Sequence, residues 1–352
     1  METKVINVQE EQIAEKEDLL RQAGEILKNG GLVAFPTETV YGLGGDGLNR
    51  ESSKKIYAAK GRPSDNPLII HIVDMDALPY IVSEVSPEVE KVAEAFWPGP
   101  LTMILPKSDT VPDETTGGLK TVAVRMPSHK VARKLIEYAG GYVAAPSANA
   151  SGKPSPTLAK YVIEDMDGRI DMIIDGGEVG IGLESTIIDM TVNPPQILRP
   201  GFITEAMLAE VLGDVDVDKT ILSNDSKLAP KAPGMKYRHY APKGQLTIVT
   251  GESKKVVRNI NELSREAGKE GKKVGIIGSE EFLAQYQADS VKSAGSRDDE
   301  QAIAHNLYRI LREFDDENVE VIYSESFDNG GMGQAIMNRL LKAAGHNVVE
   351  AE

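Results

Sequence analysis

Segments with helical and strand periodicity alternate through the first two hundred residues of the chain. Apolar residues recur at helical spacing within 12–29, and Asn29-Gly30-Gly31 is a stop signal after them. Short apolar runs typical of buried strands follow, and amphipathic helical segments separate several of them. The runs are LVAFPTETV (32–40), LIIHIV (68–73), LTMILP (101–106), TVAVRM (121–126), GYVAAP (141–146), DMIIDGG (171–177) and STIIDM (185–190). This pattern predicts an α/β domain with a mixed sheet, ending near residue 212.

The periodicity disappears between residues 213 and 243. The second half of this stretch, KAPGMKYRHYAP (231–242), is rich in aromatic, basic and proline residues. Flexible spacers seldom have such a composition, and shielding a labile intermediate from water is a usual purpose of a lid. We therefore expect 213–244 to be a linker in which KYRHYAP (236–242) closes over the first domain. The alternative is that these residues pack against the second domain as an ordinary interface.

Regular alternation of strand and helix patterns resumes at residue 245 and continues to the end of the chain. The longest helical pattern, RDDEQAIAHNLYRILREFDD, carries an apolar stripe formed by Ile303, Leu307, Ile310, Leu311 and Phe314. A βαβα pattern over roughly a hundred residues is typical of a small parallel-sheet domain. We therefore predict a second α/β domain over 245–352.

Composition narrows the classes of protein. A length of 352 residues is sufficient for two domains with proper cores, and the net charge of −15 argues against broad nucleic-acid binding. No apolar run approaches the roughly 20 residues of a membrane span. Cysteine is absent and the five histidines are never at metal-ligand spacing, so we expect no disulfide, no structural zinc and a cytoplasmic location.

The usual phosphate-binding loops, GxxxxGK[ST] and GxGxxG after a strand, are missing, and so is a GxSxG nucleophile elbow. Small polar residues instead recur where predicted strands end, in PTET (36–39), APSANASGKPSPT (145–157) and LEST (183–186). Cations accompany them at Lys60, Arg62, Arg125 and Arg199. Hydroxyls, exposed N–H groups and cations suit a phosphorylated ligand, and without a nucleophile the chemistry would depend on positioning and charge neutralisation.

Seven motifs of this chain occur in the order typical of YrdC-like proteins: PTETVYGLG, KGRPSDNPLIIH, WPGPLT, VAVRMP, APSANASGKPSPT, LESTIID and ILRPG. With PGMKYRHYAP as the interdomain linker, the whole chain resembles the long form of the threonylcarbamoyl-AMP synthase family. The resemblance implies a YrdC-like mixed twisted sheet with a concave cleft, followed by a small Rossmann-like parallel α/β domain. The corresponding boundaries are 1–212, 213–244 and 245–352.

The same resemblance implies one reaction, in which L-threonine, bicarbonate and ATP give L-threonylcarbamoyl-AMP and pyrophosphate. Mg²⁺ is expected to accompany the triphosphate of ATP. The product would pass to a separate threonylcarbamoyl transferase that modifies tRNA, so neither stable tRNA binding nor a membrane partner is expected.

The resemblance also assigns roles to residues of this sequence. The catalytic positions are Lys60, Arg62, Ser147 and Asn149. The ATP contacts are Arg62, Asn66, Thr121, Ser147, Ser155, Arg199, Arg238 and Tyr240. The L-threonine contacts are Thr39, His71, Arg125, Ala145 and Ser185. Arg125 would pair with the threonine carboxylate, because a guanidinium binds a carboxylate through two bonds. His71 follows an apolar run, and a buried core histidine is the alternative there.

Two other functions remain as alternatives. YrdC-like domains resemble concave nucleic-acid binders, although the acidic charge of this chain argues against an RNA-binding module. Carbamoyl-transfer enzymes of the hydrogenase-maturation type share the YrdC-like fold, but they carry zinc-finger and acylphosphatase segments that this sequence lacks.

Overall fold

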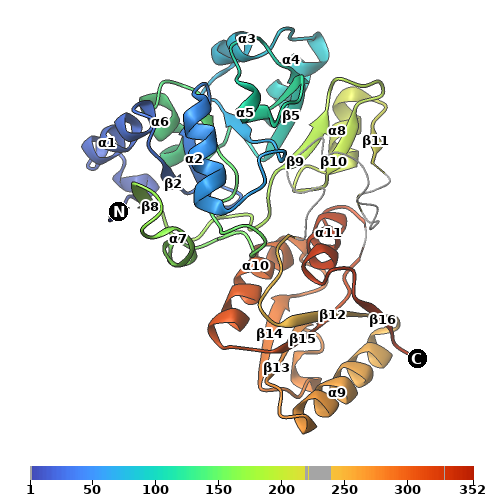
Figure 1. Ribbon diagram of the computed structural model, residues 1–352. Coiled ribbons are helices and arrows are strands. Elements are labelled where there is room, and N and C mark those ends of the chain that lie inside the picture. Colours follow the sequence, from blue (N-terminus) through green and yellow to red (C-terminus); the bar gives the residue numbers. More distant parts are fainter. Residues whose placement is uncertain (1, 219–220, 222–238, 329) are drawn as a thin grey trace. The chain divides into compact units, whose positions relative to one another are not determined.

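The computed structural model describes residues 2–218, 221, 239–328 and 330–352 (Figure 1). The chain divides into two compact units. Within the described residues, the first unit holds 2–151, 155–180, 184–218 and 221, and the second holds 152–154, 181–183 and 239–352 except 329. The short segments 152–154 and 181–183 were not expected in the second unit, and the boundaries at 212 and 244 stay a prediction.

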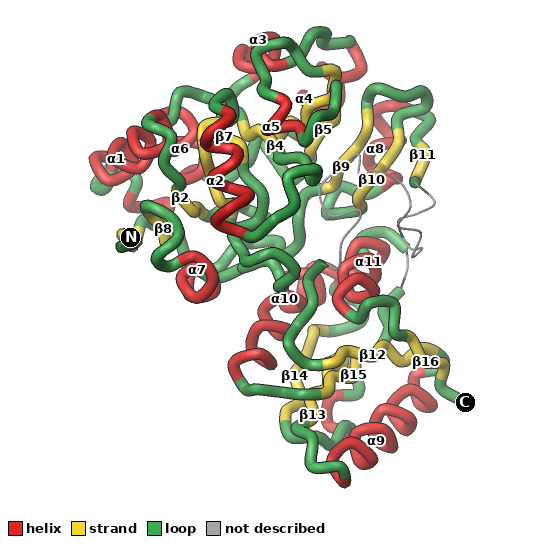
Figure 2. Tube along the Cα trace, in the orientation of Figure 1, coloured by secondary structure: helices red, strands yellow, loops and turns green. Residues whose placement is uncertain are grey.

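The first unit is built on a mixed sheet that has eleven strands in the part of the chain that is described (Figure 2). Their order is β1-β8-β2-β3-β7-β4-β6-β5-β9-β10-β11. The strands are β1 (Lys4–Asn7), β2 (Val33–Phe35), β3 (Gly42–Asp46), β4 (Ile69–His71), β5 (Leu101–Pro106), β6 (Thr121–Arg125), β7 (Val143–Ala144), β8 (Met172–Asp175), β9 (Thr186–Asp189), β10 (Gln196–Arg199) and β11 (Asp216–Val217). Each of the seven apolar runs predicted as strands contains one of them.

Eight α-helices belong to the first unit, counted over the described residues. They are α1 (Glu17–Lys28), α2 (Arg50–Lys60), α3 (Leu78–Ile81), α4 (Pro87–Phe96), α5 (Asp113–Thr116), α6 (Lys130–Tyr138), α7 (Ala159–Met166) and α8 (Glu205–Leu212). The first helix begins at Glu17 and not at residue 12, because the 3₁₀ turn Glu10–Gln12 and further turns precede it.

Strands β4, β5, β6, β9 and β10 have two differently used faces. Alternate residues of a strand point to opposite faces, and one face packs into a large core that includes α4. Residues on the other face form a small separate apolar cluster: Ile69, Ile104, Ala123, Ile187 and Leu198. His71, Thr121 and Arg125 lie on the face of this cluster, because they are two residues away from Ile69 or Ala123 along β4 or β6.

The second unit has a five-stranded, all-parallel sheet in its described part, in the order β14-β13-β15-β12-β16. The strands are β12 (Gln245–Thr250), β13 (Val274–Ser279), β14 (Ser290–Gly295), β15 (Val321–Glu325) and β16 (Val348–Glu350). Helix α9 (Ser253–Lys269) covers one face, and α10 (Glu300–Asp316) and α11 (Gly333–Ala343) cover the other (Figures 1 and 2). The predicted apolar stripe of α10 is buried along its whole length. The predicted fold class, a mixed sheet followed by a parallel α/β domain, is confirmed.

None of the described helices combines the length and the apolar character that a membrane span requires.

Candidate active site

Three of the expected catalytic residues meet at the carboxyl end of α2. The helix is capped by the side chain of Asn49 and ends where Gly61 turns the chain with φ +63°. Lys60 is therefore the last helical residue, and its Nζ donates to the backbone carbonyls of Ser147 and Asn149, at 2.5 Å each. The Ser147 hydroxyl donates to Oδ1 of Asn149 at 2.5 Å. Lys60 is 3 % exposed, so its ammonium group holds the 147–149 loop from inside the protein.

Arg62 and Asn66 lie in the loop that leads from α2 into β4. Nε and Nη2 of Arg62 donate to the carbonyls of Asn66 and Pro67, at 3.3 and 3.1 Å. Asn66 is buried, and its Oδ1 accepts no hydrogen bond from the described residues. Because most buried polar atoms in proteins are satisfied, this oxygen is a position where a donor of a ligand would be stabilised. Thr121 begins β6, the strand beside β4.

Arg125, the expected partner of the threonine carboxylate, ends β6 and has contacts on three sides. Its Nη1 donates to the hydroxyl of Thr39 at 2.8 Å, and its Nε donates to the carbonyl of Gly99 at 3.4 Å. Its Nη2 lies 2.6 Å from Oε1 of Glu38. Arg125 is 4 % exposed. The guanidinium group is therefore fixed in place before a substrate arrives.

His71 ends β4 and is paired with Arg125 in the register of the two strands. Burial and the positive charge of Arg125 lower the pKa of its imidazole to about 3. Nδ1 lies 3.1 Å from the carbonyl of Ile69, which places the ring proton on this nitrogen, and the ring meets Phe35 edge-on. His71 is therefore neutral at physiological pH. Its surroundings suit both a buried core histidine and an uncharged contact to a substrate.

Ser185, Thr102 and Arg199 form a hydrogen-bonded chain next to Arg125. Thr102 lies opposite Arg125 in the register of β5 and β6, and its hydroxyl is 2.8 Å from that of Ser185. Arg199 donates from Nη2 to the Ser185 hydroxyl at 3.1 Å and from Nε to the Ser185 carbonyl at 3.0 Å. The resemblance assigns Arg199 to ATP, whereas these contacts place it beside the residues expected to bind threonine.

Two further expected contacts have clear partners in the first unit. The Ser155 hydroxyl donates to Oε1 of Glu184 at 2.5 Å, and both residues are buried. The Ala145 N–H donates to the carbonyl of Ile69 at 2.9 Å. A backbone contact from Ala145 to an amino acid would therefore use its carbonyl group.

Tyr240 belongs to the second unit and is 5 % exposed. Its ring centre lies 5.1 Å from that of Tyr308, and the guanidinium group of Arg339 lies 5.9 Å from the Tyr240 ring. These contacts correspond to the packing alternative for the KYRHYAP segment, and the contact of Tyr240 with ATP stays a prediction. Arg238 and the preceding part of the expected lid lie outside the described residues.

The expected contacts divide between the two ends of β4 and β6. Arg62, Asn66 and Thr121 precede or begin these strands, whereas His71 and Arg125 end them. At about 3.3 Å per residue, the five steps from Asn66 to His71 span roughly 16 Å if the chain is extended. The small apolar cluster around Ile69 lies between the two ends on the same face, and we call it the apolar floor. This arrangement suits a pair of ligands whose polar groups lie at opposite ends of the floor.

Three polar residues of the site are missing from the set expected from the sequence: the buried Thr102 and Glu184, and the partly buried Glu38. Glu38 and Glu184 stand inside PTET and LEST, so the motifs contained the signal. The sequence contains no comparable signal for Thr102, because a threonine in the apolar run LTMILP is typical of an ordinary strand.

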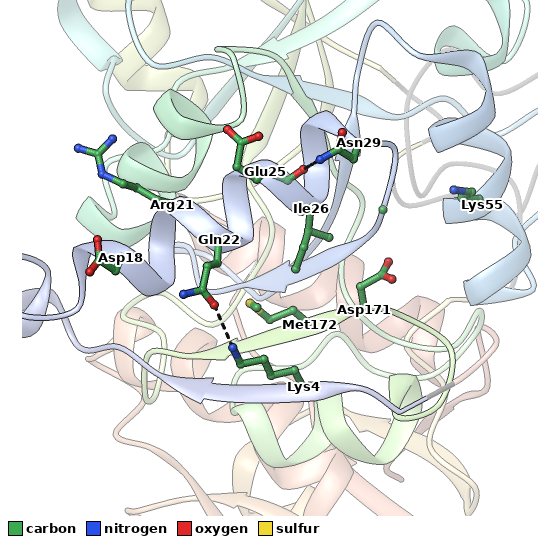
Figure 3. A pocket seen from close by; sticks show the side chains of 11 residues that line it. Lys4, Asp18, Arg21, Gln22, Glu25, Ile26, Asn29, Lys55, Asp171 and Met172 are labelled. Carbon is green, nitrogen blue, oxygen red and sulfur yellow. Dashed lines mark hydrogen bonds between the residues drawn. The ribbon is translucent and has the colours of Figure 1, made fainter.

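An open hollow of about 880 Å³ lies elsewhere in the first unit, where α1 faces β1 and β8 (Figure 3). Ile26 and Met172 lie at its base, and Lys4 donates to Gln22 across it at 3.1 Å. None of the residues expected to bind ATP or threonine is among the described residues that line it. The hollow is therefore distinct from the candidate active site.

The mixed sheet, with cations and hydroxyls at both ends of an apolar floor, defines a YrdC-like α/β domain, and a Rossmann-like domain follows it. A family model described as "Telomere recombination" matches residues 25–201. A second, described as "Threonylcarbamoyl-AMP synthase, C-terminal domain", matches residues 203–345.

Individual relatives match along almost the whole chain. The threonylcarbamoyl-AMP synthase of Pyrococcus abyssi is 49 % identical over 348 residues, 99 % of each chain. That of Bacillus subtilis is 46 % identical over 96 % of each chain. A crystal structure of P. abyssi Sua5 complexed with L-threonine is 48 % identical, with a TM-score of 0.94, and the match covers 99 % of this chain and 100 % of that one.

The chain belongs to the threonylcarbamoyl-AMP synthase family, in its long form with the extra C-terminal domain. The resemblance read from the motifs and the enzyme class, a nucleotidyltransferase, are confirmed. Matches over the full length favour this family over an RNA-binding module or a hydrogenase-maturation enzyme.

Proposed function

We propose that this protein joins L-threonine, bicarbonate and ATP into L-threonylcarbamoyl-AMP and releases pyrophosphate. The observation that carries the proposal is the division of the site between two ends of one sheet face. Threonine binds at the end that holds Thr39, His71, Arg125 and Ser185. Ala145, which lies beside Ile69 at the start of β4, is a further threonine contact on the resemblance alone. ATP binds at the end that holds Lys60, Arg62, Asn66, Thr121, Ser147 and Asn149.

The chemistry follows from this placement. The amine of threonine reacts with carbon dioxide derived from bicarbonate and becomes a carbamate. A carbamate oxygen then attacks the α-phosphorus of ATP, a new P–O bond forms, and the bond to pyrophosphate breaks. Two anions must approach each other in this step, so fixed cations lower its barrier by neutralising charge that is already in place. Arg62 and Lys60, which orders the 147–149 loop, supply that charge at the nucleotide end.

Mg²⁺ is expected to be part of the ATP substrate. The described residues contain no group of three or more His, Asp or Glu side chains arranged to hold a metal ion. Mg²⁺ commonly binds proteins through substrate phosphates and keeps several waters. It would therefore enter with the triphosphate and help to neutralise it.

Ser155, Arg199, Arg238 and Tyr240 are retained as proposed ATP contacts on the resemblance alone. Transfer of the product to a separate tRNA-modifying enzyme, without stable binding of tRNA by this chain, is part of the same proposal. So is the cytoplasmic location.

Pyrophosphate release in the presence of each amino acid in turn tests the proposal. We expect release only when threonine, bicarbonate, ATP and Mg²⁺ are all present. Equal release with serine, or full release without bicarbonate, would contradict it.

A further inference from the structure

Glu38 and Arg125 form a buried ion pair whose hydrogen bonds are incomplete. Oε1 of Glu38 lies 2.6 Å from Nη2 of Arg125. Both carboxylate oxygens of Glu38 and Nη2 of Arg125 are shielded from solvent, and apart from this ion pair they have no hydrogen bond of good geometry to a described residue. The backbone N–H groups of Glu38 and Ser128 also lie near the carboxylate and help to lower its pKa. Buried polar groups without hydrogen bonds are rare and unfavourable. The pair can therefore offer one donor and one acceptor to a ligand.

An α-amino acid complements these two groups. Its carboxylate accepts from Nη2 of Arg125, and its ammonium group donates to the Glu38 carboxylate. Charges then alternate from the guanidinium through the substrate to Glu38, so that no like charges are in contact. Nη1 of Arg125 already donates to the hydroxyl of Thr39, so Nη2 is the nitrogen that remains for the substrate carboxylate.

We propose that Glu38 receives the α-ammonium group of L-threonine and takes one of its protons, which gives the neutral amine that reacts with carbon dioxide. This inference rests on the proposed function, because it assigns a role in the same site.

The proton balance closes without a further reactant. One N–H bond of the ammonium breaks, and the proton passes to a carboxylate oxygen of Glu38. This proton converts bicarbonate into carbon dioxide and water, which restores the Glu38 carboxylate. The amine lone pair forms the N–C bond to carbon dioxide, one C–O π bond opens, and the second amine proton leaves to water. The products are the carbamate, one water and one proton.

The surroundings of Glu38 favour this transfer once threonine is bound. Burial alone would raise the pKa of the Glu38 carboxyl, but Arg125 outweighs it and holds that pKa below its usual range. The substrate carboxylate shares the charge of Arg125 and weakens its lowering effect, whereas the substrate ammonium group lowers the pKa of Glu38 until it has given up its proton. In addition, a neutral amine and a neutral carboxyl group are easier to bury than two ions.

The other titratable groups that face Glu38 do not compete for this proton near neutral pH. His71, on β4, has a pKa of about 3. His129, which precedes α6, also interacts with Glu38, and burial lowers the pKa of its imidazole. The guanidinium group of Arg125 has no acceptor for a proton.

The binding test compares L-threonine with 3-hydroxybutyrate of matching configuration, which lacks only the α-amino group. Calorimetry measures the dissociation constants of both ligands for the wild type, Glu38→Gln and Glu10→Gln. Where the analogue binds weakly, it is measured in competition with threonine. The ratio of the two constants is then compared among the three proteins. Glu10 is the matched control, because its carboxylate lies 3.6 Å from Nδ1 of His129 but is not paired with Arg125. We expect the preference for threonine to fall about 10- to 100-fold in Glu38→Gln, as for a hydrogen bond between charged groups. It should stay within twofold in Glu10→Gln.

A purely structural role of Glu38 in holding Arg125 would weaken both ligands equally and leave the ratio unchanged, which would overturn the proposal. If Glu38→Gln does not fold, Glu38→Asp supplies the same ratio, because it keeps the charge but shortens the reach to the ammonium group. A preference for threonine that is as strong in Glu38→Asp as in the wild type would then count against the contact.

The proton transfer has its own readout. The rate of pyrophosphate release by Glu38→Gln, divided by that of the wild type, should rise about tenfold from pH 7 to pH 8, because free amine then comes from solution. A flat ratio would overturn the role of Glu38 as a base. Release by the wild type alone tests the proposed function, and the binding ratio reports on Glu38 whatever that result is.

Discussion

Replacement of Arg125 by lysine separates the two ends of the site. The guanidinium group is 4 % exposed and reaches Thr39, Gly99 and Glu38 with three different nitrogens. A lysine ammonium keeps the charge, but it is a single nitrogen and cannot reproduce this fork. The substitution therefore removes the geometry of the contact and leaves the net charge of the domain unchanged.

The size of the effect follows from the lost hydrogen bonds. Hydrogen bonds to charged groups contribute about 1–3 kcal/mol each, which corresponds to a rise of about 5- to 150-fold in the dissociation constant of threonine. ATP should bind within about twofold of the wild type, since its expected contacts start at the other end of β4 and β6. The free energy of unfolding should fall by about 1–2 kcal/mol, because the bonds to Thr39 and Gly99 are no longer both made.

Calorimetry with each ligand alone and urea unfolding measure these quantities. Arg133→Lys is the matched control, because Arg133 also donates to a backbone carbonyl, that of Val73 at 3.2 Å, but contacts none of the expected site residues. Weaker ATP binding together with normal threonine binding in Arg125→Lys would mean that the two ends are assigned in reverse. Equal losses for both ligands would mean that Arg125 acts on the fold and not on one substrate.

Further predictions concern His71, Asn66 and Ser185. The pKa of His71 lies below its value in the unfolded chain, so its contribution to stability is complete above about pH 6.5 and is lost as the pH falls towards 3. Between pH 7 and pH 5, urea unfolding should therefore show a loss of about 2 kcal/mol in the free energy of unfolding from this residue. His71→Gln should remove this pH-dependent loss. Asn66→Ala should raise the dissociation constant of ATP about 3- to 10-fold in calorimetry and leave threonine binding unchanged; an unchanged ATP affinity would rule out Oδ1 as a nucleotide contact. Ser185→Ala should lower the free energy of unfolding by about 1–3 kcal/mol, because it removes the hydroxyl that contacts Thr102 and Nη2 of Arg199. Unaltered thermal unfolding would argue against this expectation.

The strands that the sequence predicted are the ones with continuous apolar runs, and those that it missed have other reasons to form. Strand β3 has the sequence GLGGD, and glycine is a poor strand residue. Its glycines are needed because a Cβ at Gly44 would approach the ring of Phe35 to 2.9 Å. Strand β1 is short and mostly exposed, and it exists through pairing with β8, which lies about 170 residues further along the chain. Local periodicity contains no information about either effect.

The motifs predicted most of the candidate site residues, but they did not predict which of these residues contact each other. Arg125 is 86 positions from Thr39, and Lys60 is 87 positions from Ser147. Such contacts depend on the strand order β7-β4-β6-β5-β9, in which β4 and β6 are parallel while β5 and β7 run against them. Without knowledge of that strand order, PTET is interpreted as a polar turn, and the sequence does not show that Glu38 inside it pairs with Arg125.

The charge balance at the proposed threonine end would favour a neutral His71. Arg125 and Glu38 together carry no net charge, and a zwitterionic amino acid carries none either, so binding adds no net charge to a buried site. A protonated His71 beside Arg125 would add one positive charge and favour simple acids over amino acids. Burial and Arg125 prevent this by lowering the pKa of His71 to about 3. The same balance disfavours ligands that lack either charge, because the unmatched member of the ion pair would then stay buried without a partner.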